Sequence, residues 1–482
     1  MVFMSENWVI FAWLGLVLAE LVGVFFALDA IANGRTAQGT VAWALALVFV
    51  PPIAVPLYFL IGARRFDGYV RARRRGKQTL DRVATRAIEA MAPWTLAQQS
   101  AESTDERSGA RNAIQRLART DWTTGNRTQL LIDGEATFAA ILAELDKATR
   151  DVCIQFYIVR ADELGWRLHA ALVSAARRGV VVRFLYDSLG SKEIAGGFVD
   201  ELHEAGVLAE AFHSRRNSTW FRLNFRNHRK IVIVDGRTAF IGGHNVGREY
   251  LGLDPEMGAW RDTHIRVDGP AVLAAQLSFA EDWNSATGSV PTLSWTCESC
   301  GEDRVLIVPS GPGDQFETCA LMFHQVIQCA RQRLWIASPY FVPDEGIVLN
   351  LQLAALRDVD TRILIPDRSD NALISMSAYS YYEDVIPAGV RLCRYHAGFL
   401  HHKVFLCDEI AGIGTANFDN RSFRINFEIT VIVAGGPTAV HVQEMFTRDL
   451  ERSTQATLAD FTRRSWWFRA LARICRLISP LQ

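Results

Sequence analysis

The chain has 482 residues, and at about 150 residues per domain this length predicts two to three domains with sizeable cores. Its 51 Lys and Arg residues are balanced by 52 Asp and Glu residues, which leaves a formal charge of −1 at pH 7. Because the chain has no overall basic field, its composition argues against nucleic acid as a partner.

Two apolar segments near the start predict transmembrane helices. Residues 8–28 contain one charged residue, Glu20, and residues 41–62 contain none; each segment has about the 20 residues that a helix needs to cross a bilayer. A signal peptide is disfavoured because residues 1–7 carry no Lys or Arg. The second segment contains three prolines, which we expect to kink the helix without abolishing it: Pro51, Pro52 and Pro56. Residues 1–63 are therefore predicted to form a transmembrane helical hairpin.

The region after the hairpin predicts its orientation. Residues 64–77 hold seven Lys and Arg residues opposed only by Asp67, whereas the link between the two spans offers only Arg35. The positive-inside rule therefore places the rest of the chain in the cytoplasm, and the same basic run can rest on anionic lipid headgroups. Residues 78–91 have helical periodicity, while the polar residues 98–110 predict a linker. Residues 64–127 are together interpreted as a basic juxtamembrane segment and linker.

The rest of the chain repeats itself, and five segments recur in the same order. The paired segments are 152–162 and 334–344, 178–188 and 357–367, 205–213 and 388–396, 227–245 and 400–417, and 264–272 and 431–440. Short apolar strands alternate with helical stretches in both copies, which predicts an α/β fold with a central sheet in each. We expect two similar domains, at 128–300 and 301–482, packed about a pseudo-two-fold axis.

One repeated segment carries residues that are typical of catalysis. In NHRKIVIVDGRTAFIGGHN, strand alternation places His228 and Lys230 on one face. Asp235 has the opposite parity and begins an Asp-Gly turn, and Asn245 closes the segment after a glycine pair that permits close backbone approach. The second copy supplies His401, Lys403, Asp408 and Asn417. A single copy is modest support for an active site, but the duplication strengthens it considerably.

These paired motifs resemble those of the phospholipase D superfamily, whose members carry two HxKxxxxD motifs, each followed by Gly and Asn. Other features resemble the bacterial cardiolipin synthase family: the two N-terminal spans, the basic run, the duplicated region, SGP at 310–312 and RLISPL at 476–481. The resemblance covers essentially the whole chain. It implies two phospholipase D-like domains whose histidines and lysines converge on one phosphodiester.

The resemblance also implies roles for these residues. His228 is expected to be the nucleophile that forms a phosphatidyl-histidine, and His401 the general acid and then the general base; the residues alone do not assign this order. Four side chains are expected to bind the phosphoryl oxygens: Lys230, Lys403, Asn245 and Asn417. Such a site needs no metal and no cofactor.

The acidic residues near the motifs have alternative interpretations. Asp235 and Asp408 belong to the catalytic motifs by resemblance, but their parity and turn position predict that they hold the hairpins through backbone hydrogen bonds. Asp262 and Glu428 follow the motifs, where a downstream acid either orients a histidine or lies on the surface. The second copy also departs from the family, because five residues separate Asp408 from its glycine where six follow Asp235. This difference puts the position of Asn417 in question.

The remaining features bear on ligands. Cys297 and Cys300 have metal-like spacing, but they lack a nearby second pair, so we interpret them as a loop feature, with zinc as the alternative. The segment 463–481 is amphipathic and suits an interfacial helix or a domain-packing helix.

The predicted function is transfer of a phosphatidyl group from one phosphatidylglycerol to another, giving cardiolipin and glycerol at the lipid bilayer, with a homo-oligomer as an option. The alternatives are a membrane-tethered phospholipase D hydrolase, a transferase that uses another alcohol, a nuclease and a non-catalytic scaffold.

Overall fold

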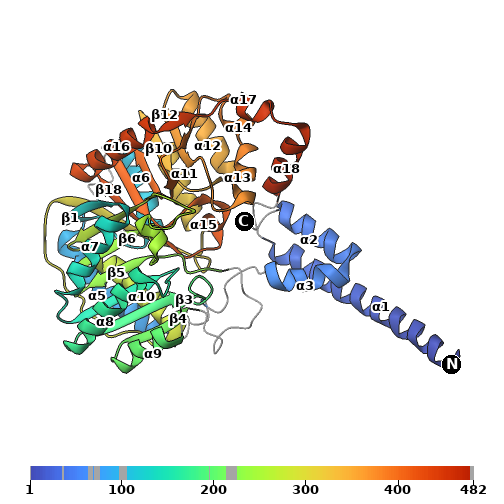
Figure 1. Cartoon of the computed structure of the whole chain (residues 1–482), viewed down its shortest axis with the longest axis horizontal. Coiled ribbons are helices and arrows are strands. Elements are labelled where there is room, and N and C mark those ends of the chain that lie inside the picture. Colours follow the sequence, from blue (N-terminus) through green and yellow to red (C-terminus); the bar gives the residue numbers. More distant parts are fainter. Residues whose placement is uncertain are drawn as a thin grey trace. The chain divides into compact units, whose positions relative to one another are not determined.

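The structure is a computed structural model that describes residues 2–34, 37–62, 69, 76–96, 106–194, 196–212 and 225–477 (Figure 1). The chain divides into two compact units. The first contains residues 1–70 and 215–225, and the second contains residues 71–214 and 226–482. Most of the basic run at 64–75 and the end of the RLISPL segment lie outside the described residues.

The first unit consists of three helices, α1 (Val2–Asn33), α2 (Ala37–Phe49) and α3 (Pro51–Ile61). Within α1, Trp13–Asn33 is long and apolar enough to cross a membrane, with a mean hydropathy of 2.2 over 21 residues. The second predicted span is not one kinked helix but two short ones, because Val50 precedes a proline and leaves the helical region at φ −138°. The expectation of a kink was therefore wrong at this position. Helices α1 and α2 approach closely at Gly23, where a Cβ would lie 2.2 Å from the Leu47 carbonyl oxygen.

The second unit is built on one continuous sheet of fifteen strands, in the order β19-β13-β12-β10-β15-β16-β18-β9-β1-β8-β6-β5-β2-β3-β4. The first half contributes β1 (Thr123–Ile132), β2 (Asp151–Phe156), β3 (Val181–Asp187), β4 (Leu208–Phe212), β5 (Ile231–Val234), β6 (Thr238–Gly242) and β8 (Thr263–Asp268). The second half contributes β9 (Asp303–Ser310), β10 (Arg333–Ala337), β12 (Asp360–Pro366), β13 (Arg391–Tyr395), β15 (Val404–Cys407), β16 (Ile410–Gly414), β18 (Glu428–Ala434) and β19 (Ser453–Gln455).

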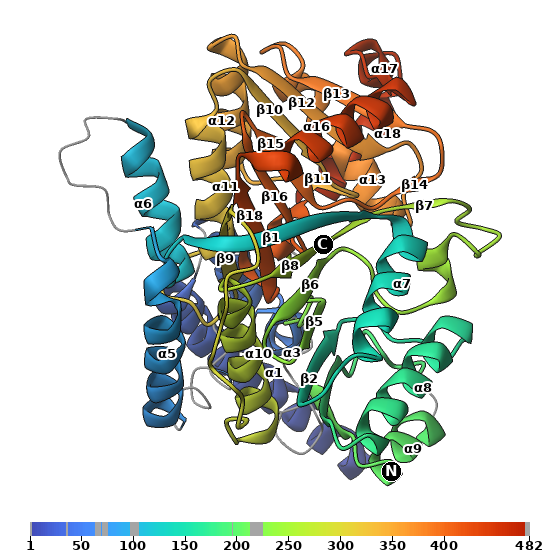
Figure 2. The ribbon, with the colours of Figure 1, turned by 90° about the vertical axis from the view of Figure 1, so that its left-hand side faces the viewer.

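The strand order confirms the predicted repeat. Outward from the centre, β1, β8, β6, β5, β2, β3 and β4 correspond to β9, β18, β16, β15, β10, β12 and β13, as a pseudo-two-fold axis requires. The halves meet where β1 and β9 pair antiparallel, with Thr123 opposite Val305. Figure 2 shows β1 crossing between the two halves. The prediction of a separate central sheet in each half is thus modified, because the two sheets share an edge and become one.

Helices cover the sheet in both halves, and the structure gives each half its own hydrophobic core. The first half has α7 (Asp133–Leu145), α8 (Glu163–Arg177), α9 (Gly196–Glu204), η2 (Arg248–Leu251) and α10 (Val272–Thr287). The second half has α11 (Thr318–Cys329), α12 (Glu345–Leu356), α13 (Ala372–Tyr379), α14 (Tyr382–Val385), α15 (Asn420–Arg424), α16 (Gly436–Glu451), α17 (Ala459–Thr462) and α18 (Trp466–Leu477). Asp162 and Asp344, which end equivalent repeats, cap α8 and α12 by accepting hydrogen bonds from Gly165 and Ile347.

The predicted linker region contains helices that pack on the second unit. Helix α5 (Lys77–Met91) buries the side of the helix that its periodicity predicts, formed by Leu80, Val83, Ala87 and Met91. The one-turn η1 (Ala92–Trp94) follows it. The predicted linker at 98–110 overlaps α6 (Glu106–Ala118), which contributes Ile114 and Ala118 to the core of the second half. This polar helix is stabilised by tertiary packing that its own composition does not reveal.

Candidate active site

Both motifs lie at equivalent places in the two halves, on extended segments that lead into β5 and β15. The four basic side chains are buried: His228 is 8% exposed, Lys230 0%, His401 7% and Lys403 4%. Each lysine turns back along its own strand, and its Nζ donates to the carbonyl oxygen of the histidine two residues earlier, at 2.7 Å for Lys230 and 2.6 Å for Lys403. The shared face predicted from strand alternation is therefore observed in both copies.

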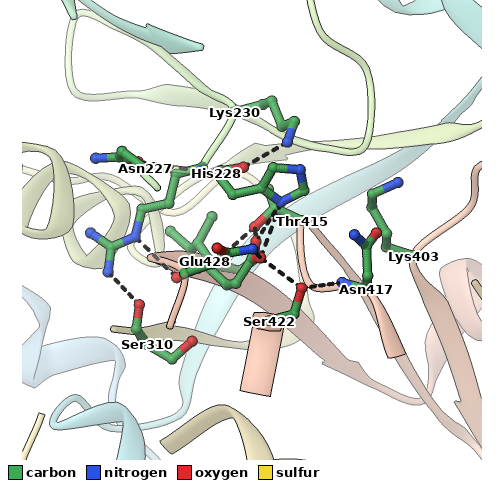
Figure 3. Close-up of polar contacts among 12 residues, drawn as sticks. Asn227, His228, Lys230, Ser310, Lys403, Thr415, Asn417, Ser422 and Glu428 are labelled. Atoms are coloured by element: carbon green, nitrogen blue, oxygen red, sulfur yellow. Dashed lines mark hydrogen bonds and ion pairs between the residues drawn. The ribbon is translucent and has the colours of Figure 1, made fainter. Parts of the chain in front are cut away.

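The two histidines are oriented by carboxylates that cross between the halves. The Nδ1 of His228 lies 3.0 Å from both carboxylate oxygens of Glu428, on β18 of the second half (Figure 3). The Nδ1 of His401 lies 2.6 Å from Asp262, which immediately precedes β8 of the first half. Both acids are fully buried, so the surface role considered for them is wrong. Each acid follows one motif in sequence but serves the histidine of the other.

Backbone pairing between the halves produces this exchange. The His228 N–H donates to the carbonyl oxygen of Phe427, the residue before Glu428, at 3.0 Å. Correspondingly, the His401 N–H donates to the carbonyl oxygen of Arg261, the residue before Asp262, at 2.7 Å. The second contact belongs to a short parallel pair between β7 (Trp260–Arg261) and β14 (Phe399–Leu400). Each histidine is thereby placed directly beside the acid of the other half.

The carboxylate of Glu428 is held by a full set of donors. Besides His228, it accepts hydrogen bonds from the hydroxyls of Thr415 at 2.6 Å and Ser422 at 2.9 Å (Figure 3). The amide of Asn426 also donates to it, at 3.1 Å. Burial alone would raise the pKa of Glu428, but the interaction with His228 and the charge of Lys230 outweigh it and lower the pKa. Glu428 is therefore ionised at neutral pH.

Asp262 depends on a glycine for its position. A Cβ on Gly243 would lie 2.1 Å from the Asp262 Oδ1, so only glycine permits this carboxylate to approach the backbone. Asp262 also accepts a hydrogen bond from the backbone N–H of Thr263 at 2.8 Å. Burial opposes its ionisation, but the charge of Lys403 and the interaction with His401 hold its pKa far below the usual range. The glycine pair predicted to allow close backbone approach has this specific function at Gly243.

The imidazoles of both motif histidines are neutral at pH 7. Burial is the main reason for the lowered pKa of His228 and of His401, the latter to about 3, and the nearby lysines lower both further against the pull of the carboxylates. A neutral ring that faces a carboxylate through Nδ1 carries its proton there, which leaves a lone pair on Nε2. Burial also lowers the pKa of Lys230 well below its usual value and that of Lys403 to about 8. The Nε2 of His228 thus offers a lone pair, while the Nζ of Lys403 lies 3.2 Å from the Nε2 of His401.

The two predicted asparagines have different surroundings. The Asn245 side chain accepts from the backbone N–H of Ile158 and donates to the Tyr250 hydroxyl, both at 3.0 Å. In contrast, the Asn417 Oδ1 is buried without a hydrogen-bond partner among the described residues, while the Asn417 backbone N–H donates to Ser422 at 3.1 Å. Asn417 therefore retains hydrogen-bonding capacity that Asn245 uses in structural contacts.

The shorter spacing in the second motif is absorbed by a turn. Ile231 pairs with Ile241 in the β5–β6 hairpin, and Val404 pairs with Ile413 in the β15–β16 hairpin. In both hairpins the first paired residue lies three positions after the motif histidine, and its partner immediately precedes the glycine, Gly242 or Gly414. The one-residue difference in length therefore falls entirely within the turn. The strand that leads towards Asn417 therefore keeps the register of its counterpart in the first half.

Asp235 and Asp408 lie at the turn ends of these hairpins, separated from the histidines by β5 and β15. Asp235 accepts from the backbone N–H groups of Thr149, Arg150 and Asp151 at 2.7–3.0 Å. Asp408 accepts in the same way from the N–H groups of residues 331–333, at 2.9–3.1 Å. Both adopt the left-handed conformation, with φ of 53° and 51°. These contacts favour the turn-holding role over a contact with phosphate.

Two buried pairs escaped sequence reasoning, and both involve the middle residue of a motif. Arg229 donates to Asp282 on α10 at 2.8 Å, and also to the backbone carbonyls of Glu428 and Ser310 in the other half. At the equivalent place, His402 lies 3.1 Å from Asp449 on α16. The sequence offered one positional signal for these pairs: Asp282 and Asp449 each lie in the helix that follows the last repeated strand of their half. Arg229 ties the backbone at Glu428 to the segment that carries His228.

Aromatic rings flank both histidines. The Tyr157 ring centroid lies 5.0 Å from that of His228, and the Trp260 centroid lies 4.8 Å from that of His401.

Among the described residues, no group of three or more His, Cys, Asp or Glu side chains is arranged to hold a metal ion. Cys297 donates to the Ala90 carbonyl oxygen, and Cys300 is exposed. The site consists of histidine, lysine, carboxylate and amide groups drawn from both halves.

Comparison with known proteins identifies relatives along nearly the whole chain. A family model described as "Cardiolipin synthase, PLD-like domain" matches residues 141–283 and 323–450. Cardiolipin synthase A of Pseudomonas entomophila (strain L48) is 44% identical over 471 residues, which cover 96% of this chain and 97% of the relative. Cardiolipin synthase A of Pseudomonas aeruginosa (strain LESB58) is 42% identical over 478 residues, covering 97% and 96%. The solved phosphatidylserine synthase of Haemophilus influenzae Rd KW20 shares the fold, with a TM-score of 0.58 at 12% identity over 77% of this chain and 100% of that one.

Proposed function

This chain belongs to the cardiolipin synthase family of phospholipase D-like proteins, and we propose that it transfers a phosphatidyl group from one phosphatidylglycerol to a second, forming cardiolipin and releasing glycerol. The observation that carries the proposal is the crossed arrangement of the two buried histidine–carboxylate pairs, His228 with Glu428 and His401 with Asp262. Two oriented imidazoles in one site suit a reaction that needs a nucleophile and a proton carrier.

In the first step, Nε2 of one histidine attacks the phosphorus of phosphatidylglycerol. A P–N bond forms while the P–O bond to the headgroup glycerol breaks, and the other histidine donates a proton to the leaving oxygen. Neutrality suits the nucleophile. The anionic phosphodiester raises the pKa of the neighbouring imidazole when it binds, which prepares that ring as the acid. By family resemblance His228 is the nucleophile and His401 the acid.

In the second step, the now neutral acid histidine takes the proton of the primary hydroxyl of the second phosphatidylglycerol. The hydroxyl oxygen attacks phosphorus, a P–O bond forms and the P–N bond breaks, so that the nucleophile is regenerated. Lys230 and Lys403 stabilise the charge that develops on the phosphoryl oxygens, and Asn417 adds an amide hydrogen bond. Asn245 contributes mainly by holding Ile158 and Tyr250 in place.

The proposal extends to the location of the protein. The Trp13–Asn33 stretch of α1 supports a membrane anchor, and α2 with α3 is proposed to complete a second crossing. The Lys and Arg residues that follow residue 62 support a cytoplasmic position for the catalytic unit at the inner membrane. Both phosphatidylglycerol molecules would then reach the site from the membrane surface.

The test is incubation of the purified full chain with phosphatidylglycerol, followed by analysis of lipid and water-soluble products. Cardiolipin and glycerol in equal amounts are the expected products. Phosphatidic acid without cardiolipin would show that water is the acceptor and would replace the synthase by a hydrolase. Added ethanolamine or serine, if either captured the phosphatidyl group in preference to phosphatidylglycerol, would assign a different acceptor.

A further inference from the structure

Helix α18 (Trp466–Leu477) is the last element of the described chain, and its side chains form distinct rows. Residues spaced by four and then three positions share one side of a helix. The inward row packs against α13 and consists of Phe468, Ala472 and Cys475. Ala472 and Cys475 are buried, and the Phe468 ring lies 5.5 Å from that of Tyr379. One side of α18 is therefore part of the catalytic unit.

The helix is fixed in place by ion pairs as well as by packing. Arg473 binds Glu383 at 2.7 Å, and Arg476 binds Asp384 at 2.5 Å. The Arg476 guanidinium also lies 4.1 Å from the ring centroid of Tyr381. The outer side of α18 is thus held in a defined orientation on the protein surface.

The opposite side of α18, here called the outer face, is apolar and exposed. Its members and their exposed fractions are Trp466 at 74%, Trp467 at 58%, Leu471 at 40%, Ile474 at 52% and Leu477 at 80%. Together they form an arc of the helix that is wider than a single row of side chains. A contiguous exposed apolar surface of this kind marks a site of contact with a protein or a membrane, whereas scattered exposed apolar side chains need no explanation.

The charge and the aromatic content of the helix indicate which partner contacts the outer face. Residues 463–477 contain five arginines and no Asp or Glu. Arg473 and Arg476 pair with acids of α14, and the Arg464 guanidinium lies 5.2 Å from the ring centroid of Phe468. A segment that combines an excess of arginine with exposed tryptophans suits the headgroup region of an anionic bilayer, since tryptophan favours that interface and arginine favours its negative charge.

We propose that the outer face of α18 lies in the headgroup region of an anionic bilayer and holds the catalytic unit at the membrane surface. The proposal relies on the proposed function only for the identity of the anionic lipid, phosphatidylglycerol. It assigns the surface a role separate from that of the membrane-spanning segment, which tethers the chain but does not fix the distance of the active site from the lipid.

A lipid-quenching experiment on the full chain tests the contact itself. Ile474→Cys, in a Cys300→Ser background that removes the exposed thiol, is labelled with an environment-sensitive fluorophore and placed in nanodiscs. The matched control is Thr447→Cys on the exposed side of α16. In phosphatidylglycerol-containing nanodiscs with a quencher on the acyl chains, the label at position 474 is expected to shift to the blue and be quenched, and the control label is not. Equal quenching at both positions would overturn the proposal.

Two further outcomes separate the alternatives. A blue shift at position 474 that grows with protein concentration, without lipid quenching, would assign the outer face to a second copy and contradict the bilayer contact. Quenching at position 474 in a preparation that forms no cardiolipin would uphold the contact while refuting the proposed function. The two proposals therefore fail independently.

Kinetics supply a second readout. The variant Trp467→Ser/Leu471→Ser/Ile474→Ser is expected to raise the apparent KM for phosphatidylglycerol in nanodiscs several-fold and to leave kcat unchanged. The control is Val440→Ser on α16, a single exposed apolar side chain (54% exposed) that is not part of an apolar row, and it should leave both constants unchanged. A KM that stays at the wild-type value in the α18 variant would count against the proposal.

Discussion

At the scale of single residues, the central feature is that each histidine takes its carboxylate from the other half of the molecule. Glu428 and Asp262 lie 200 and 139 residues from the histidines that they orient. The motif residues were predictable because their spacing is fixed by strand alternation. The exchange of acids was not, because it depends on backbone contacts between segments that are far apart in the chain and carry no mutual sequence signal.

The carboxylates can be tested with variants that keep their shape. Glu428→Gln and Asp262→Asn remove the charge that fixes the histidine tautomer, so each is expected to lower kcat by about 10²–10⁴-fold with little change in KM. Steady-state kinetics on phosphatidylglycerol measure both constants. The matched control is Glu201→Gln, which alters the separate pair with His169 and should retain wild-type activity. Near-normal turnover in Glu428→Gln would contradict the crossed arrangement.

Three buried histidines predict that the protein loses stability in acid. Burial is the main reason for the lowered pKa of His244, to about 4, of His401, to about 3, and of His264, well below 6.5. The unfolded chain binds more protons than the native one once the pH falls below 6.5. The free energy of unfolding should therefore decrease on acidification, by up to about 1.4 kcal/mol per pH unit for each histidine, down to a pH near these native values.

Thermal unfolding as a function of pH measures this effect. The Tm of the full chain in detergent should fall as the pH decreases from 6.5, and His244→Gln/His264→Gln should show a shallower fall. An equally steep fall in the double variant would mean that other groups cause the acid sensitivity.

At the scale of elements, the hairpins show how a motif tolerates a length change. The turn after Asp408 is one residue shorter than the turn after Asp235, yet the strands keep equivalent registers. The first hairpin was predictable from the Asp235–Gly236 turn and the apolar strands, and the second from its repetition of that segment. Their identical registers were not, because turn lengths alone do not say which strand residues face each other. The break between α2 and α3 was likewise missed, since the prolines permitted either a kink or a break.

Insertions distinguish the turn from the strand. A glycine inserted after Glu409 lengthens the shorter turn to match the other copy, and we expect at least half of the wild-type activity. An alanine inserted between Phe405 and Leu406 shifts the remainder of β15 to the opposite face, and we expect complete loss of cardiolipin formation. Activity assays on both variants, with circular dichroism to verify folding, provide the comparison. An inactive but folded turn variant would show that the short turn itself has a function.

At the scale of the whole molecule, the pseudo-two-fold repeat was visible in the sequence, but the continuous sheet was not. The repeat predicted two similar domains, and the strand order agrees. Edge pairing of β1 with β9 has no sequence pattern of its own, because an edge strand looks the same whether it meets solvent or another strand. The active site is consequently complete only when both halves are joined.

A break in the connection between the halves tests this integrity. The exposed segment around Glu298–Cys300 joins α10 to β9, and a specific protease site placed there allows cleavage of the folded chain. The two fragments should remain associated and active, because the β1–β9 pairing and both histidine–carboxylate pairs survive. Separation of the fragments on size exclusion in detergent, without denaturant, would contradict a shared sheet.

The most direct test of the central claim, that the two halves form one site with one nucleophile, is the stoichiometry of the covalent intermediate. Full-length protein is mixed with phosphatidylglycerol, denatured rapidly at alkaline pH and analysed by mass spectrometry of its peptides. We predict one phosphatidyl group per chain, on His228, and no adduct in His228→Ala. Adducts on both His228 and His401 of the same chain, or an adduct on neither, would contradict the account.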